Sequence, residues 1–127
     1  MATVELTKEN FEKVINESPM VIVDFWAPWC GPCRGFAPIY DKAAEAHQGV
    51  VFGKVNTDAE QELAGAFNIR SIPTLMVFRE KVVLFQQAGA LPASALEQVI
   101  SQTKSLDMAK VHQEIAARDA HGEQKQA

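Results

Sequence analysis

Apolar residues recur along this chain at two spacings, one typical of amphipathic helices and one typical of buried strands. Helical spacing predicts helices over residues 7–17, 34–47, 60–67 and 92–103. Short apolar runs predict strands at 20–26, 50–55, 75–78 and 82–85. With a further strand ahead of the first helix, the order β-α-β-α-β-α-β-β-α predicts a single α/β domain in which a central mixed sheet carries helices on its faces.

The end of the chain departs from this pattern, because its charges are balanced and its last residues offer nothing to bury. Four apolar residues recur there at helical spacing: Leu106, Met108, Val111 and Ile115. One expectation is a further helix over 105–118, docked on the domain or on a partner; the alternative is a solvated continuation of the last helix that frays into disorder. We therefore expect a domain over 1–103 and a C-terminal extension over 104–127.

Charge and hydropathy exclude several classes of function. The 127 residues carry 12 Lys and Arg against 16 Asp and Glu, a net charge of −4, so a broadly basic surface for nucleic acid is not expected. No apolar run approaches the ~20 residues of a membrane span, and the start of the chain lacks the basic and apolar segments of a secretory signal. We expect a cytoplasmic protein that binds neither nucleic acid nor membrane.

The chain has two cysteines, Cys30 and Cys33, separated by two residues. A disulfide that closes so short a loop stabilises the folded protein by only ~2 kcal/mol in the chain-entropy model. The pair is therefore better suited to redox chemistry than to the role of a structural disulfide. The pair lies between the strand 20–26 and the helix 34–47, at the sheet edge where active sites of open α/β folds gather. With Cys30 as N-cap, free N–H groups and the helix dipole stabilise its thiolate and lower its pKa below ~8.5.

The different positions of the two cysteines predict different roles. Cys30 attacks a substrate disulfide and forms a mixed disulfide, which Cys33 then resolves by attacking Cys30. Cys33 lies one turn further into the helix, so we expect it to be less exposed and to keep its proton longer. Gly31 permits the tight chain reversal, and Pro32 occupies the first turn, where its missing N–H is not needed.

Two cysteines at this spacing also occur as half of a zinc site or as inert thiols. A zinc site needs two more ligands. The candidates are His47, His112 and His121, none of which stands at finger-like spacing to the others. We therefore expect no metal.

Asp24 interrupts the otherwise apolar run 20–26. An ionised and unpaired carboxylate in a buried strand costs several kcal/mol, so its pKa should rise. Such a carboxyl near a cysteine pair can relay a proton to or from the less exposed thiol. A satisfied structural carboxylate is the other interpretation. Lys54, in a neighbouring strand pattern, is a candidate charge partner, although a lysine there is more often a plain strand-edge residue.

Ile72-Pro73 stands directly before a predicted strand. Because cis bonds make up only ~5% of such peptide bonds, the sequence alone favours trans. Trp26 and Trp29 are candidates for core aromatics. Trp29 stands next to Cys30 and is the better candidate for a contact surface.

The segment Val23-Asp-Phe-Trp-Ala-Pro-Trp-Cys-Gly-Pro-Cys33 resembles the active-site sequence of the thioredoxin family. The likeness continues in order and without obvious gaps over about residues 3–103, through Ala37-Pro38, Gly53-Lys-Val-Asn56, Ile69-Arg-Ser-Ile-Pro-Thr74 and Gly89-Ala90. Several independent motifs at the family's spacing make the resemblance specific.

This resemblance implies the thioredoxin fold, with a central mixed sheet flanked by helices on both faces, and a protein-disulfide reductase that serves cell redox homeostasis. It implies that Cys30 is the nucleophile, that Cys33 is the resolving thiol and that Asp24 transfers protons with Lys54 near it. The dipeptide between the cysteines, Gly31 and Pro32, would tune the redox potential.

The resemblance also implies how substrates and electrons reach the pair. Pro73 would be cis and face the cysteines, and a groove for the substrate chain would be lined by Trp29, Ile72, Pro73 and Gly89. No cofactor would be bound, because the family receives reducing equivalents from NADPH through thioredoxin reductase, a flavin enzyme. The expected partners are that reductase and disulfide-containing proteins, and the expected state is a monomer.

The chain departs from the family pattern at two positions inside the domain. Glu80-Lys81 replaces a turn that usually contains glycine, which should strain or reshape the hairpin. Gly35 falls in the first turns of the active-site helix, where glycine costs ~1 kcal/mol against alanine.

Two other functions compete with a general disulfide reductase. The apolar residues of the extension suggest a structural module, in which the fold is a binding subunit of a complex. An exported disulfide oxidant is disfavoured, because strong oxidants of this fold typically carry another dipeptide between the cysteines. We expect a reductase that cycles between the Cys30–Cys33 disulfide and the dithiol.

Overall fold

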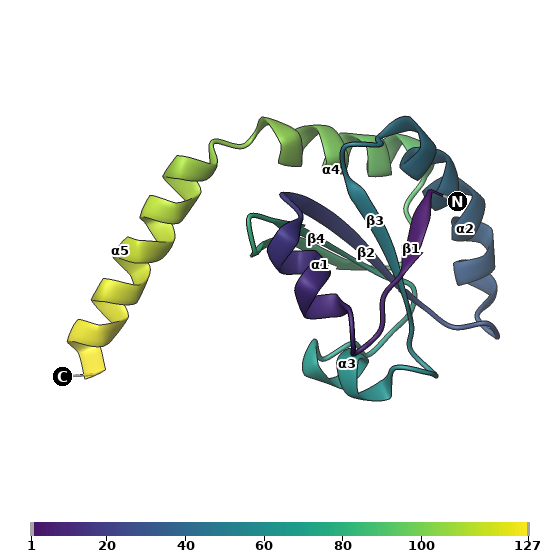
Figure 1. Ribbon diagram of the computed structural model, residues 1–127, viewed down its shortest axis with the longest axis horizontal. Coiled ribbons are helices and arrows are strands. Elements are labelled where there is room, and N and C mark those ends of the chain that lie inside the picture. Colours follow the sequence, from purple (N-terminus) through teal and green to yellow (C-terminus); the bar gives the residue numbers. More distant parts are fainter. Residues whose placement is uncertain (1, 127) are drawn as a thin grey trace.

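Five strands form one mixed β-sheet in the computed structural model, which describes residues 2–126 and their side chains as far as residue 120 (Figure 1). The strands are β1 (Thr3–Glu5), β2 (Met20–Trp26), β3 (Val51–Asn56), β4 (Thr74–Arg79) and β5 (Val82–Ala88). They lie in the order β1-β3-β2-β4-β5; β1, β3 and β2 are parallel, whereas β4 is antiparallel to both of its neighbours, β2 and β5. The run that is apolar on both faces, β2, is thus the central strand.

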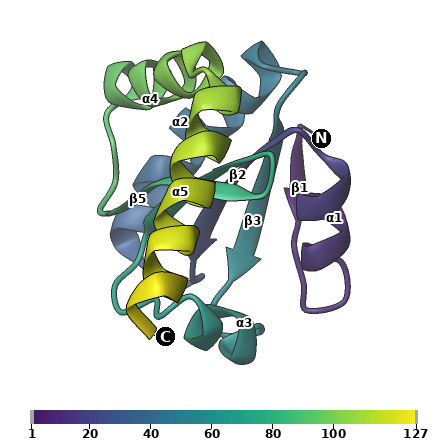
Figure 2. The same ribbon diagram turned by 90° about the vertical axis from the view of Figure 1, so that its left-hand side faces the viewer.

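Helices cover both faces of this sheet. They are α1 (Phe11–Glu17), α2 (Gly31–Ala46), α3 (Gln61–Ala66), α4 (Ala93–Ser105) and α5 (Met108–Gln126). α2 and α4 pack on one face and α1 and α3 pack on the other, while α5 extends away from the domain (Figures 1 and 2). The predicted fold class, a mixed sheet flanked by helices with an additional C-terminal helical segment, is confirmed.

Alternate residues of β2 enter two separate hydrophobic cores. Ile22 packs with Phe36 of α2 and Leu96 of α4, whereas Phe25 packs with Phe11 of α1. Because side chains alternate along a strand, Asp24 points to the same face as Ile22. The buried carboxyl therefore lies on the sheet face that α2 covers, and α2 is the helix that begins at the cysteine pair.

Tyr40 and Gly53 hold α2 against the strands beneath it. The hydroxyl of Tyr40 lies 2.9 Å from the carbonyl oxygen of Ile22 and 2.7 Å from that of Gly53, and it can donate to one of them at a time. Leu6 fills the space that a Cβ at Gly53 would occupy, so only glycine fits there. The Tyr40 hydroxyl thus ties α2 to β2 and β3, and with it the helix that begins at the cysteines, whereas Leu6 packs on the opposite face of the sheet.

Several elements differ in extent from their predicted ranges. The first helix begins at Phe11 with Asn10 as its N-cap, because the carbonyl of Thr7 accepts from Asn10 and Phe11 in a preceding turn. The strand predicted to end at residue 85 continues to Ala88. Its last residues are exposed, since β5 is an edge strand, so they carry no apolar signal.

The β4–β5 turn contains no glycine, and its backbone is strained. Glu80 and Lys81 have φ values of 51° and 70°, which are left-handed conformations that favour glycine or asparagine. The expected strain at this turn is therefore present. The backbone N–H of Glu80 donates to the carbonyl of Pro19 at 2.8 Å, which ties the turn to the start of β2.

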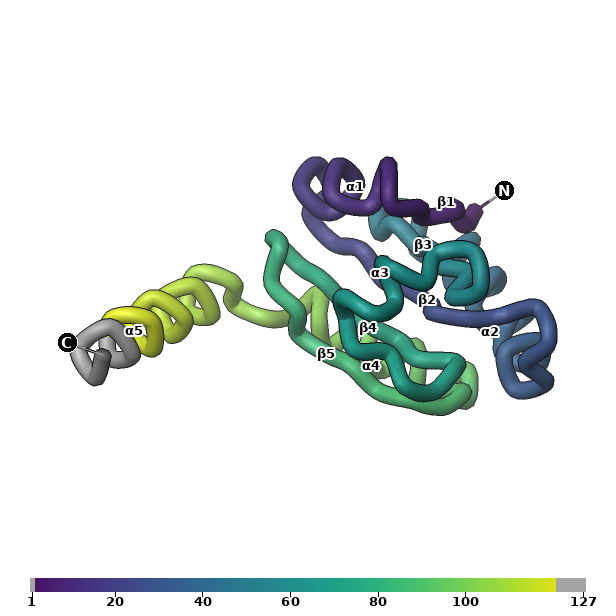
Figure 3. The backbone as a smooth tube through the Cα atoms, turned by 90° about the horizontal axis from the view of Figure 1, so that it is seen from below, coloured from purple at the N-terminus to yellow at the C-terminus, as the bar shows by residue number. Residues whose placement is uncertain are grey.

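α5 is a separate helix, and as far as residue 120 its contacts with the domain lie near its first turns. The guanidinium of Arg79 donates to the carbonyl oxygens of Thr103 and Leu106, both at 2.9 Å, and Met108 is buried. His112 pairs with Glu80 at 2.9 Å. Beyond these contacts α5 leaves the body of the protein (Figure 3). The division of the chain into 1–103 and 104–127 stays a prediction.

Candidate active site

The cysteine pair lies at the junction between β2 and α2. Cys30 is the N-cap of α2 and Cys33 is in its first turn; the two are joined by a disulfide, with their Cα atoms 5.2 Å apart. The backbone N–H of Cys33 donates to Sγ of Cys30 at 3.2 Å. In the dithiol form this donor and the helix N-terminus favour negative charge on the Cys30 sulfur.

In the disulfide form both cysteines are buried, with Cys30 4% exposed and Cys33 3% exposed. One expectation about this turn needs correction. Gly31 is not in a tight reversal but is the first residue of α2, and its φ is not positive. Pro32 is in the first turn as expected, where no N–H is lost.

The segment around Pro73 faces the cysteines. The Ile72–Pro73 bond is cis, as the resemblance implies, and the carbonyl oxygen of Ile72 lies 3.7 Å from Sγ of Cys30. The N–H of Gly89, at φ 102°, donates to the carbonyl of Pro73 at 2.8 Å. The structure therefore brings Ile72, Pro73 and Gly89 together beside Cys30.

Trp29 and Arg34 shape the loop that leads to Cys30. Trp29 is 66% exposed, and its Nε1 donates to Oδ2 of Asp58 at 2.9 Å. The guanidinium of Arg34 donates to the carbonyl of Pro28 at 3.0 Å. Neither Asp58 nor Arg34 was predicted as part of the site: Asp58 lies 29 residues from Trp29 along the chain, and Arg34 bonds a backbone carbonyl, which leaves no side-chain pattern in the sequence.

Asp24 is 1% exposed, and its Oδ1 has no hydrogen-bond partner among the described residues. Burial raises the pKa of this carboxyl to about 7, the positive charge of Lys54 opposes the rise, and Asp41 adds to it. Asp24 and Lys54 are register partners on β2 and β3, so their side chains emerge on the same face of the sheet. The structure thus brings these two predicted site residues together.

Trp26 lies between Lys54 and the cysteines. The Lys54 ammonium lies 4.9 Å from the centroid of the Trp26 ring, and the indole packs against the buried cluster of Ala27, Cys30 and Cys33. The sequence indicates Trp26 only as a candidate core aromatic, because its contact with Lys54 depends on the register between β2 and β3.

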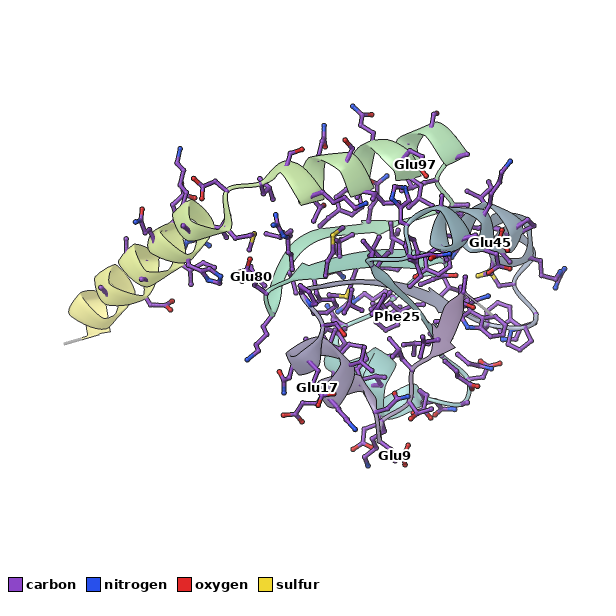
Figure 4. The ribbon with its side chains drawn as sticks, turned by 45° about the horizontal axis from the view of Figure 1, so that its top comes forward. Glu9, Glu17, Phe25, Glu45, Glu80 and Glu97 are labelled. Atoms are coloured by element: carbon purple, nitrogen blue, oxygen red, sulfur yellow. A yellow bond between two sulfur atoms is a disulfide. The ribbon has the colours of Figure 1, made fainter. Side chains whose placement is uncertain are left out.

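Trp26 and Lys54 open onto a hollow of about 760 Å³ at the β1 edge of the sheet. Its charged lining residues are Glu5, Asp41, Glu45 and Lys54, and Figure 4 labels Glu45 on the helix above it. Within the part of the chain whose side chains are described, no group of three or more His, Cys, Asp or Glu is arranged to hold a metal ion.

No helix in residues 2–126 is both long and apolar enough to cross a membrane.

A disulfide at a helix N-terminus that faces a cis-proline, next to a central strand that carries a buried carboxyl, defines a thiol–disulfide oxidoreductase. The family model described as Thioredoxin matches residues 2–102. The chain belongs to the thioredoxin family, and it is a protein-disulfide reductase that works through its Cys30–Cys33 pair.

Individual relatives agree with this assignment. "Putative thioredoxin 2" of Streptomyces coelicolor is 56% identical over 119 residues, which cover 94% of this chain and 89% of the relative. "Thioredoxin 1" of a Nostoc species is 41% identical over 103 residues, or 80% of this chain and 96% of the relative. The structure of Plasmodium falciparum thioredoxin superimposes with a TM-score of 0.74 at 36% identity, covering 79% of this chain and 98% of that one.

Proposed function

We propose that Cys30 is the nucleophile of this reductase and that Cys33 is its resolving thiol. The observation that carries the assignment is the hydrogen bond from the Cys33 N–H to Sγ of Cys30. In the dithiol this bond stabilises a thiolate on Cys30 and gives Cys33 no equivalent help. Because the thiolate is the attacking species, Cys30 reacts first.

Disulfide exchange then proceeds in two steps. The Cys30 thiolate attacks one sulfur of the substrate disulfide, and the other substrate sulfur leaves as a thiolate. Cys33 loses its proton and attacks Sγ of Cys30, which releases the second substrate sulfur as a thiolate. The substrate gains two electrons and the cysteine pair is oxidised to the disulfide.

Asp24 accepts the proton that Cys33 loses, and Lys54 assists by its charge. A pKa of about 7 lets the carboxyl take and return a proton near neutral pH. Gly31 and Pro32 tune the redox potential, since they set the backbone between the two sulfurs.

The substrate chain lies in a groove lined by Trp29, Ile72, Pro73 and Gly89. The support for this groove is that Ile72 approaches Sγ of Cys30, while Gly89 is bonded to Pro73. Trp29 offers a large exposed ring next to the nucleophile. Such a ring gives a protein substrate apolar contact area at little entropic cost.

The oxidised pair must be reduced again after each turnover. Thioredoxin reductase supplies the electrons from NADPH, and no cofactor is held by this chain. The substrates are disulfide-containing proteins, the site of action is the cytoplasm, and the chain acts as a monomer. Residues 1–103 are the domain that carries the activity.

The assay that tests these roles is reduction of insulin disulfides with dithiothreitol as electron source. Cys30→Ser should abolish the reaction, whereas Cys33→Ser should accumulate a Cys30–insulin disulfide visible by mass spectrometry. Asp24→Asn should slow release of that intermediate near neutral pH, with Asp119→Asn on the exposed face of α5 as the matched control. Full activity of Cys30→Ser would contradict the proposal.

A further inference from the structure

Trp26 is in contact with two groups that the reaction uses. One side of its indole packs against the buried cluster that contains Cys30 and Cys33. The Lys54 ammonium lies over its ring, 4.9 Å from the centroid. A lysine ammonium at this distance is attracted by the negative face of an aromatic ring.

Lys54 has other groups to which it could turn. Glu5, Asp41 and Glu45 line the same hollow as Lys54 and Trp26. A lysine side chain is long and flexible, and each of these carboxylates is less buried than Asp24. Placement of the ammonium beside Asp24 therefore requires a contact that holds it there.

Trp26 supplies such a contact. It follows Asp24 by two residues on β2 and so emerges on the same face of the sheet, directly across from the strand that carries Lys54. The indole Nε1 is buried and makes no hydrogen bond to any described residue. The ring therefore interacts through its aromatic face, which contacts the Lys54 ammonium, and through its packing on the cysteine cluster.

We infer that Trp26 is a positioning residue that keeps the Lys54 ammonium over the indole, on the sheet face that carries Asp24, and away from Asp41 and Glu45. The inference rests on the proposed proton-transfer role of Asp24 for its consequence in the reaction. The placement of Lys54 itself does not depend on that role.

The effect on Asp24 follows from the charges around it. The groups that face it are Lys54 of β3 and Tyr40 and Asp41 of α2; its register partner on β4, Leu75, is uncharged. Lys54 alone among these lowers the pKa of Asp24. When the ring is lost and Lys54 turns to the outer carboxylates, the carboxyl should hold its proton to higher pH.

The test is a carboxyl-carbon NMR titration of Asp24 in the oxidised full-length protein. Trp26→Leu should raise the midpoint by about half to one pH unit, a three- to tenfold fall in the dissociation constant. Trp26→Phe should restore most of the original midpoint, because it keeps an aromatic face. Lys54→Gln should also raise the midpoint, and Trp26→Leu added to Lys54→Gln should cause no further rise.

Three results would overturn the inference. The first is an unchanged midpoint in Trp26→Leu while Lys54→Gln shifts it, and the second is a double variant whose shift is the sum of the single shifts. The third needs no variant: without upfield ring-current shifts of the Lys54 side-chain protons in the unmodified protein, the ammonium does not lie over the ring. If Trp26→Leu fails to fold, this spectrum and Trp26→Phe still decide.

Failure of the proposed role of Asp24 would look different. In that case Asp24→Asn would reduce insulin at the unmodified rate, while the titration would still report whether Trp26 places Lys54.

Discussion

The indole Nε1 of Trp29 donates a 2.9 Å hydrogen bond to the carboxylate of Asp58. This bond joins the residue before Cys30 to the turn that follows β3. The ring of Trp29 remains largely exposed, so Asp58 fixes its direction without covering it. If Trp29 contacts protein substrates as proposed, they meet an aromatic surface that is already ordered.

Asp58→Ala should weaken the binding of protein substrates and leave the reduction of small disulfides unchanged. Free rotation of Trp29 adds an entropic cost when the substrate binds, of about 0.5–1.5 kcal/mol, so KM for insulin should rise roughly two- to tenfold with little change in kcat. Reduction of a small aromatic disulfide, which needs no groove, should stay the same. Equal losses for both substrates would show that Asp58 acts on the cysteines instead.

The buried carboxyl of Asp24 should make the protein less stable as the pH rises. Its pKa is about 7 in the folded protein against 3.8 for an ordinary Asp. Between these values the unfolded chain loses its proton and the folded chain keeps it. The free energy of unfolding therefore falls between about pH 4 and pH 7, by at most about 4 kcal/mol.

Asp24→Asn should remove most of this pH dependence. Urea unfolding of the oxidised protein at pH 4.5 and pH 8 should show a gain in stability for the variant that is larger at pH 8. Asp119→Asn, an exposed change of the same type, should leave the difference between the two pH values intact. A parallel loss of stability at both pH values would contradict the raised pKa.

Gly35→Ala should stabilise the active-site helix. Gly35 lies inside α2, is exposed, and a Cβ there would meet no atom within 4 Å. Alanine in a helix interior is favoured by about 0.5–1 kcal/mol over glycine, which a urea midpoint resolves. Gly89→Ala is the matched comparison, because it adds the same methyl group in open space but at φ 102°, and it should destabilise.

Much of the fold could be predicted from the sequence because its signals are local. The run from Met20 to Trp26 is apolar on both faces, and only a central strand buries both of its faces. The end of β5 gave no signal, since its exposed Gln86 and Gln87 do not alternate with apolar residues. The start of α1 was misplaced because Thr7 and Asn10 are both good N-cap residues and only the turn between them decides.

The site residues likewise fall into those that the local sequence indicates and those that it does not. The spacing of Cys30 and Cys33 and the charge at Asp24 are visible in the sequence. The contact between Lys54 and Trp26 requires the parallel register of β2 and β3, and the bond from Trp29 to Asp58 requires the path of the chain after β3. These partners are brought together only by tertiary packing, which no local pattern records.

The β4–β5 turn should gain stability when one left-handed residue becomes glycine. Lys81 has a φ of 70° and an exposed side chain. Lys81→Gly should raise the free energy of unfolding by about 1 kcal/mol, since a side chain in this conformation costs about that much. Lys81→Ala removes the same charge but keeps the Cβ, so it should give no comparable gain; equal gains would assign the effect to charge.

Arg79 should hold the connection between α4 and α5. Its Nη1 donates to the carbonyls of Thr103, Lys104 and Leu106 at 2.9, 3.3 and 2.9 Å. Thr103 and Lys104 are in the last turn of α4 and Leu106 is its C-cap, where a helix leaves most carbonyls without intrahelical donors; the Thr103 carbonyl also accepts from the N–H of Leu106. Figure 4 shows the neighbouring Glu80 at the tip of the turn, facing α5, where it pairs with His112.

Arg79→Gln should therefore release the extension while leaving the domain folded. Hydrogen bonds from a charged donor contribute about 1.5–3 kcal/mol, so amide exchange over residues 103–112 should accelerate roughly ten- to hundredfold. Exchange in β2 should be unaffected, and so should insulin reduction, because Arg79 bonds the C-terminal end of α4, whereas the cysteines lie at the N-terminus of α2. Arg118→Gln, an exposed arginine further along α5, is the matched control. Unchanged exchange at residues 103–112 in Arg79→Gln would mean that Met108 and the pair of Glu80 with His112 suffice to anchor the helix.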